Sequence, residues 1–94
     1  MAFAQVNATV GTTATRIFVL PKGLPYTAVQ VSNGHSSSIF IGASSAVATN
    51  GANHGQTLGA NATQQIWLNA GDELWAIASV ATEPDDISIL YSGI

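Results

Sequence analysis

Residues 66–78 read Ile-Trp-Leu-Asn-Ala-Gly-Asp-Glu-Leu-Trp-Ala-Ile-Ala, and this stretch decides the fold class. Two short apolar runs flank the segment 69–72, whose Asn, Gly and Asp residues are typical of a tight turn. The runs are too short for helices, and their large aromatic and branched side chains favour strands. The stretch therefore predicts a β-hairpin with strands at 65–68 and 73–78.

The same pattern extends in both directions along the chain. Short runs rich in Val, Ile, Phe and Thr are bounded by Gly, Asn, Pro and Ser, and no segment has a long helical period. Asn33-Gly34 predicts a second hairpin loop, which runs through Ser37, and segment 21–25 predicts a rigid corner with two prolines. The expected strands lie at 3–10, 15–20, 27–32, 38–42, 63–68, 73–79 and 87–91.

These strands predict one all-β domain over residues 1–94. About seven short antiparallel strands with frequent turns suit a β-sandwich, a jelly-roll-like fold or a small β-barrel. The segment 43–62 differs, because Val47 and Leu58 are the two large apolar side chains among its Ser, Ala, Asn and Gly residues. It is expected to be a long irregular loop, either a mobile insertion or an arm that contacts a neighbouring subunit, with room for short strands at 46–49 and 56–58.

The composition predicts a surface with few charges. Of the 94 residues, 47% are hydrophobic and 7% are charged, against a usual charged share of about 25%. Small and amide-bearing residues must therefore cover much of the surface, and such a surface is easily dehydrated when it meets a partner. We expect a subunit that packs against other proteins and is made in the cytoplasm without a signal peptide.

The composition also argues against several classes of function. The two cations, Arg16 and Lys22, cannot form the basic patch that nucleic acid or an anionic membrane surface requires. No run approaches the roughly 18 apolar residues of a membrane-spanning helix. The chain has no Cys, and His35 and His54 are its two histidines, so we expect no structural zinc and no cofactor.

No pattern in the sequence predicts catalysis. A nucleophilic Ser or Thr needs a positioned base, and the sequence alone leaves open a triad of His35 or His54 with Asp72 or Asp86. No Gly-x-Ser-x-Gly turn or phosphate-binding loop accompanies them. The acidic cluster at 83–86 lacks the spaced ligands of a calcium-binding loop and is expected to be a solvated turn. We predict a protein that is not an enzyme, with no catalytic residue and no metal.

The expected hairpin carries large apolar side chains on both of its faces. Strand alternation separates Trp67 from Leu68 and Trp75 from Leu74. A sheet with one solvated face carries polar residues there, so this hairpin is either covered on both sides or meets a partner through its second face. Tryptophan is enriched at protein interfaces. The residues predicted to make such contacts are Phe3, Val47, Leu58, Trp67 and Trp75.

An ordered set of strands and turns runs from about residue 8 to residue 92. After residues 8–15, Val29-Gln30-Val31-Ser32-Asn33-Gly34 precedes Ile39-Phe40-Ile41-Gly42, and Thr49-Asn50-Gly51, Leu58-Gly59-Ala60 and residues 66–78 follow. This order resembles small virion structural proteins of tailed bacteriophages. In that group the last of these strands carries a tyrosine where this chain has Trp75, so an aromatic residue is kept at the position.

The resemblance implies a capsid decoration (cement) protein. Such a protein sits on the outer surface of the virion head, binds the phage major capsid protein and stabilises contacts between its copies, after synthesis in the host cytoplasm. It also implies a homo-oligomer, for which a trimer is expected. A head-fibre, tail or baseplate subunit fits the same composition. A carbohydrate-binding β-sandwich module, in which Trp67 or Trp75 stacks on sugars, is the alternative from another class.

Overall fold

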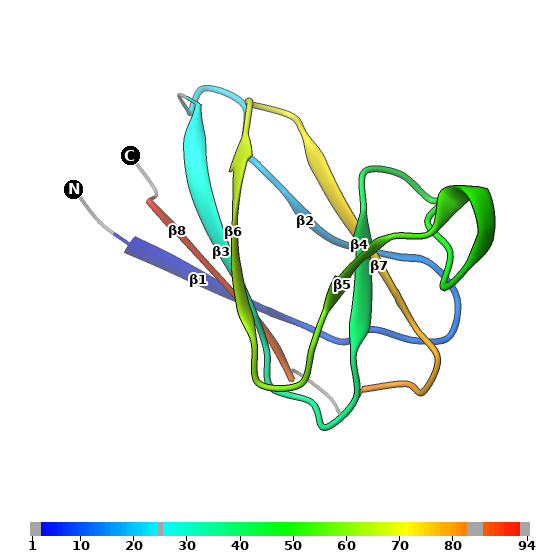
Figure 1. Cartoon of the computed structure of the whole chain (residues 1–94). Helices are drawn as coiled ribbons and strands as arrows, with labels where there is room; N and C mark the ends of the chain where they lie inside the picture. Colours follow the sequence, from blue (N-terminus) through cyan, green and yellow to red (C-terminus); the bar gives the residue numbers. More distant parts are fainter. Residues whose placement is uncertain (1–2, 25, 83–85, 93–94) are drawn as a thin grey trace.

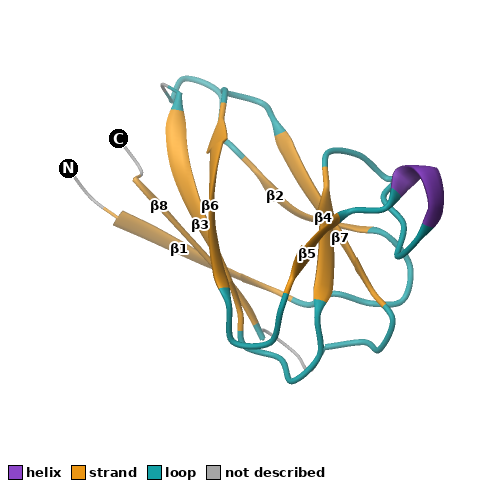
Figure 2. Ribbon diagram, in the orientation of Figure 1, coloured by secondary structure: helices purple, strands orange, loops and turns teal. Residues whose placement is uncertain are grey.

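The computed structural model describes residues 3–24, 26–82 and 86–92, except for the side chains of Phe3 and Ser92. Strands make up nearly all of its regular structure (Figures 1 and 2). A single 3₁₀ turn, η1 (Gly51–Asn53), accompanies them in this part of the chain. The strands are β1 (Phe3–Ala8), β2 (Thr15–Val19), β3 (Thr27–Asn33), β4 (Ile39–Gly42), β5 (Gln56–Leu58), β6 (Thr63–Leu68), β7 (Glu73–Ala78) and β8 (Ile87–Ser92).

The strands form two antiparallel sheets of four. Sheet A has the order β1-β8-β3-β6, and sheet B has the order β2-β7-β4-β5. Counted from the two ends of the chain, the strands pair in a nested way: β1 with β8, β2 with β7, β3 with β6 and β4 with β5. This is the pairing of one long hairpin rolled into a sandwich, as in a jelly roll. The predicted all-β sandwich is confirmed, with two separate sheets rather than a closed barrel.

The two predicted hairpins are wrong, although seven of the strands lie within two residues of their expected bounds. β3 belongs to sheet A and β4 to sheet B, so the loop after Asn33 crosses from one sheet to the other. The turn at 69–72 likewise carries the chain from β6 in sheet A to β7 in sheet B. Turn residues reverse the chain direction, but burial of the apolar faces decides whether the next strand pairs alongside or packs opposite.

The core lies between the two sheets and follows strand alternation. In β3, Val29 and Val31 point inward and are fully buried, whereas Gln30 between them points outward and is exposed. In β7 every second side chain, starting at Leu74, is buried, and these side chains share one face of the strand as the sequence predicted. The other fully buried large side chains are Val10, Leu20, Ile39, Ile87 and Ile89.

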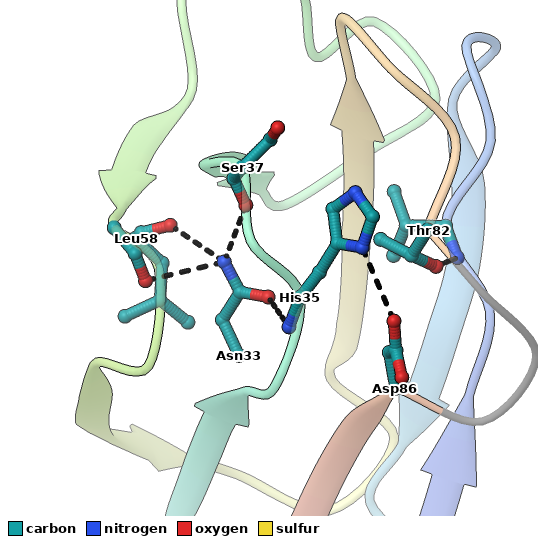
Figure 3. A network of polar contacts seen from close by, with 8 residues as sticks. Asn33, His35, Ser37, Leu58, Thr82 and Asp86 are labelled. Carbon is teal, nitrogen blue, oxygen red and sulfur yellow. Dashed lines mark hydrogen bonds and ion pairs between the residues drawn. The ribbon is translucent and has the colours of Figure 1, made fainter.

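A buried amide ties two loops to the end of β3 at one end of the sandwich (Figure 3). The Asn33 side chain is 0% exposed, and its Nδ2 donates to the backbone oxygens of Ser37, Leu58 and Gly59 at 2.9, 3.1 and 3.2 Å. Its Oδ1 accepts from the backbone N–H of His35 at 2.9 Å. Because buried polar groups must be paired, these bonds hold both the β3–β4 loop and the chain after β5 against the end of β3.

The segment 43–62 is structured, and it contains the short strand β5 that the sequence suggested at 56–58. Val47 anchors it, with a side chain that is 7% exposed. A Cβ atom added at Gly42 or at Gly55 would lie 2.6 Å from the Val47 side chain, so two glycines make the space that this valine fills. Gly42 faces outward from β4, and the segment therefore packs onto the outer side of sheet B.

Replacing Gly55 with alanine tests this anchoring. The new methyl group would lie 2.6 Å from Val47 Cγ2 and 2.9 Å from the backbone oxygen of Ile41, which cannot move cheaply. We expect a loss of about 1–3 kcal/mol in the free energy of unfolding, measured by urea titration. Gly59→Ala is the control, because no atom lies within 4 Å of its added Cβ. Equal stability of the two variants would contradict the described packing.

Candidate functional site

Trp67 and Trp75 lie on opposite outer faces of the sandwich. Trp67 is in β6 of sheet A, and Trp75 is in β7 of sheet B. Both point away from the core, because the neighbouring Leu68 and Leu74 are buried. The two tryptophans therefore belong to two separate surfaces.

The outer side of sheet B, here called face B, is largely apolar. Directly paired residues point to the same side of a sheet, so Phe40 and Ile77 are neighbours on face B, as are Gly42 and Trp75. Face B consists of the outward residues Arg16, Val19, Phe40, Gly42, Thr57, Glu73, Trp75 and Ile77.

Side-chain contacts fix Trp75 in one orientation on face B. Its indole Nε1 donates to Glu73 Oε1 at 2.8 Å, and Glu73 Oε2 lies 3.5 Å from Arg16 Nη1. The Arg16 and Glu73 side chains are 54% and 40% exposed, so their ion pair adds little stability. These contacts matter more for the binding of a partner than for stability. The indole N–H already has an acceptor, and the two charged side chains on the strands of sheet B neutralise each other.

The segment 43–55 borders this apolar surface. Val47 covers Gly42, and the ring of His54 meets Phe40 edge-on at 5.2 Å between centroids. Phe40, Trp75 and Ile77 are each half-buried, and no third sheet covers them in the described part of the chain. Face B is thus a preformed apolar surface with a polar margin. Protein–protein interfaces are built in the same way, with an apolar core and a polar rim.

The outer side of sheet A, here called face A, has a different character. The strands of sheet A contain no Asp, Glu, Lys or Arg. Face A presents amides, hydroxyls and few apolar groups, through Gln5, Asn7, Ala28, Gln30, Ser32, Thr63, Gln65, Trp67, Ser88 and Leu90. At one corner Trp67 is 53% exposed and stacks on Tyr26, which is 59% exposed.

The structure brings together His35 and Asp86, one of the pairings that the sequence left open (Figure 3). His35 Nδ1 lies 3.2 Å from Asp86 Oδ2, and the His35 side chain is 11% exposed. Its Nε2 is buried and has no hydrogen-bond partner among the described residues, so no Ser or Thr hydroxyl there is placed for activation. The pair links the β3–β4 loop to the start of β8.

An open depression of about 370 Å³ lies where β4, β6 and β7 meet. Its carboxylates are already engaged, because Asp72 accepts from the backbone N–H of Asn69 at 2.7 Å and Glu73 binds Arg16 and Trp75. Among the described residues, no three His, Asp or Glu side chains gather in a way that could hold a metal ion. Residues 83–85, which include two of the three acidic residues of the predicted turn, lie outside the described part of the chain, so that turn is described only at Asp86.

The structure places the five predicted contact residues in different environments. Trp67 and Trp75 are on outer faces. Val47 and Leu58 are 7% and 3% exposed, because they pack against other residues of the chain itself. The backbone of Phe3 lies in β1, and its side chain is outside the described atoms. Sequence reasoning missed the surface roles of Tyr26, Phe40 and Ile77. The outward direction of Phe40 and Ile77 was readable from alternation, whereas Tyr26 precedes β3, and the neighbours of all three depend on which strands pair.

No helix in the described residues combines the length and the hydropathy needed to cross a membrane. Searches against protein-family models, curated proteins and solved structures found no match to this chain.

Proposed function

We propose that this chain is a non-enzymatic structural protein of a tailed-phage virion, a capsid decoration protein that packs on the outer surface of the head. In this role it would bind the major capsid protein, as one subunit of a homo-oligomer, and add contacts across subunit boundaries. The observation that carries the proposal is face B, an apolar surface with a fixed tryptophan and a self-neutralised charge pair. The sequence resemblance supplies the identity of the partner.

The physical chemistry of face B suits a permanent protein contact. Burying Phe40, Trp75 and Ile77 in an interface removes apolar area from water, at about 25 cal/mol for each Å². Little is lost in dehydration, because the Trp75 N–H and the Glu73 carboxylate already satisfy each other. A rigid surface also pays little ordering entropy on binding. A shell offers many equivalent sites, so modest contacts at each of them sum to a large effect on capsid stability.

The architecture adds a weaker argument by analogy. Eight-stranded jelly rolls recur in viral capsid subunits, although a fold by itself does not fix a function. A head-fibre, tail or baseplate subunit would use the same kind of surface at another place on the particle. Immunogold electron microscopy of virions separates the two: label over the head supports a decoration protein, and label confined to the tail contradicts it.

Replacing Ile77 with glutamate tests the use of face B. A carboxylate in the middle of a desolvated apolar contact has no partner, so we expect binding to purified phage heads to weaken by at least about 100-fold. Binding is measured by co-sedimentation of the purified protein with heads that lack it. Leu90→Glu is the matched control, because Leu90 is an exposed strand residue on face A.

The two variants are expected to differ in binding to phage heads. Loss of head binding by Ile77→Glu, with head binding retained by Leu90→Glu, would support face B as the contact surface. Equal binding by Ile77→Glu and the unaltered chain would overturn it. Thermal unfolding of both variants shows that any loss is not due to unfolding.

A further inference from the structure

We propose that the corner of face A around Tyr26 and Trp67 is a binding site for a neutral saccharide. The site comprises these two rings together with the amide side chains of Gln30 and Gln65. It lies on the opposite sheet from face B, so it does not depend on the proposed contact with a capsid.

The two rings form a preorganised aromatic platform. Their centroids are 5.1 Å apart and their planes are inclined by 24°, which is an offset stack. Each ring holds the other in place, so a ligand need not immobilise them when it binds. With 59% and 53% of Tyr26 and Trp67 exposed, the pair also leaves a large apolar area in water. Such an area is stabilised by a ligand that has flat apolar C–H faces, as the ring of a sugar has.

Two amide side chains without a hydrogen-bond partner among the described residues lie beside the platform. Gln30 and Gln65 are direct partners across β3 and β6, in the row next to the Ala28–Trp67 pair. A strand rises about 3.3 Å per residue, so Gln65 lies about 6.6 Å along β6 from Trp67, within reach of the edge of a sugar stacked on the ring. Both glutamines are exposed, and neither side chain bonds another described residue. An amide offers two N–H donors and one acceptor oxygen, which matches pairs of neighbouring hydroxyl groups.

The absence of charged residues from the strands of sheet A favours an uncharged ligand. No strand of sheet A carries an Asp, Glu, Lys or Arg residue, and beyond the glutamines the face continues with a Ser32–Thr63 hydroxyl pair at 3.0 Å. A phosphate, a sulfated sugar or a sialic acid would lose its water without gaining a cation. A neutral, hydroxyl-rich ligand needs no cation on the surface that binds it. Its hydroxyl groups can bond the amides and hydroxyls of face A instead.

The alternative ligand for paired aromatic rings is a proline-rich peptide. Such peptides dock in grooves lined by aromatic rings, which are held apart to receive a proline. Here Tyr26 and Trp67 are stacked on each other, which leaves no slot between them. Their surroundings are an open sheet face covered with amides and hydroxyls. The geometry therefore favours a sugar lying on the rings.

The test begins with an array of immobilised neutral and acidic oligosaccharides, probed with the unaltered chain of residues 1–94. We expect binding to one or more neutral oligosaccharides and none to the acidic ones. Calorimetric titration with the strongest neutral ligand then compares variants. Trp67→Ala and Tyr26→Ala are each expected to weaken binding by about tenfold or more, because they remove the stacking surface. Gln65→Ala keeps both rings and is expected to weaken binding by a smaller factor.

The control is Val80→Ser, which removes an equally exposed apolar side chain (57% exposed) outside the site and is expected to leave affinity unchanged. Circular dichroism checks that each variant is folded. Three results would overturn the site: no bound neutral oligosaccharide, binding restricted to acidic ones, or equal affinity in Trp67→Ala and the unaltered chain. Binding of a proline-rich peptide that requires both rings, with no sugar bound, would assign the platform to the other ligand class and would also reject the proposal.

Discussion

Replacing Asn33 with aspartate is expected to lower the free energy of unfolding by at least about 3 kcal/mol. The substitution keeps the shape of the side chain, so packing is preserved while hydrogen bonding and charge change. It removes the Nδ2 donor that serves three backbone oxygens, of Ser37, Leu58 and Gly59. Each such bond contributes about 1 kcal/mol, and an unpaired buried group costs about 1–3 kcal/mol more. The new carboxyl oxygen would face those same oxygens with no solvent to screen it.

Urea titration followed by far-ultraviolet circular dichroism measures the loss. Asn53→Asp is the control, since Asn53 is exposed in η1 and its side chain bonds no other described residue. That variant is expected to stay within about 0.5 kcal/mol of the unaltered chain. A domain of this size is stable by about 5–15 kcal/mol, so the Asn33 variant should melt at a clearly lower temperature. Similar stability of the two variants would show that the amide does not hold the loops.

Ile89→Ala is expected to cost about 3–4 kcal/mol of stability. Ile89 is 0% exposed, in the middle strand pair of sheet A, and its direct partners are Val6 of β1 and Val31 of β3. Truncation of a buried isoleucine loses the transfer free energy of the removed carbons and leaves a cavity, for a usual total of 2–5 kcal/mol, or about the middle of that range here. β8 is hydrogen-bonded on both sides, to β1 and to β3, so it cannot shift to close the gap.

The neighbouring residue supplies a stringent control for this second prediction. Leu90 follows Ile89 in β8, points to face A and is 38% exposed. Leu90→Ala removes side-chain carbons from the same strand but opens no cavity, and should cost less than about 1 kcal/mol. Equal losses in the two variants, measured by thermal unfolding, would mean that β8 is turned over relative to the described register. Such a turn would also exchange the residues of face A for core residues.

These two stability tests bear on the proposed functions, because both surfaces depend on the register of the sheets. Face A places Gln30 beside Gln65 only while β3 pairs with β6 as described. Face B places Phe40 beside Ile77 only while β4 pairs with β7. A chain with two outer faces of such different chemistry can hold a protein partner on one side and leave the other side free for a small ligand.

The positions of the strands and the alternation of their side chains could be predicted from the sequence. Strand alternation predicted which side chains of β6 and β7 share a face, because that pattern is set by the backbone of each strand alone, and the fold then showed which of the two apolar faces is buried. The low charge likewise followed from composition, and it marked the chain as one with an easily dehydrated surface.

Which strands are partners depends on the packing of the whole chain. Asn33-Gly34 and the 69–72 turn look like hairpin turns, yet each passes the chain between sheets, and β1 finds its partner β8 at the far end of the chain. Pairing of this kind is a long-range choice, settled by which arrangement buries the apolar faces of all the strands at once. For the same reason the sequence could name Trp67 as a surface residue but could not place it against Tyr26 and beside Gln30. Those contacts exist because β3 and β6, which are separated in sequence, lie side by side in sheet A.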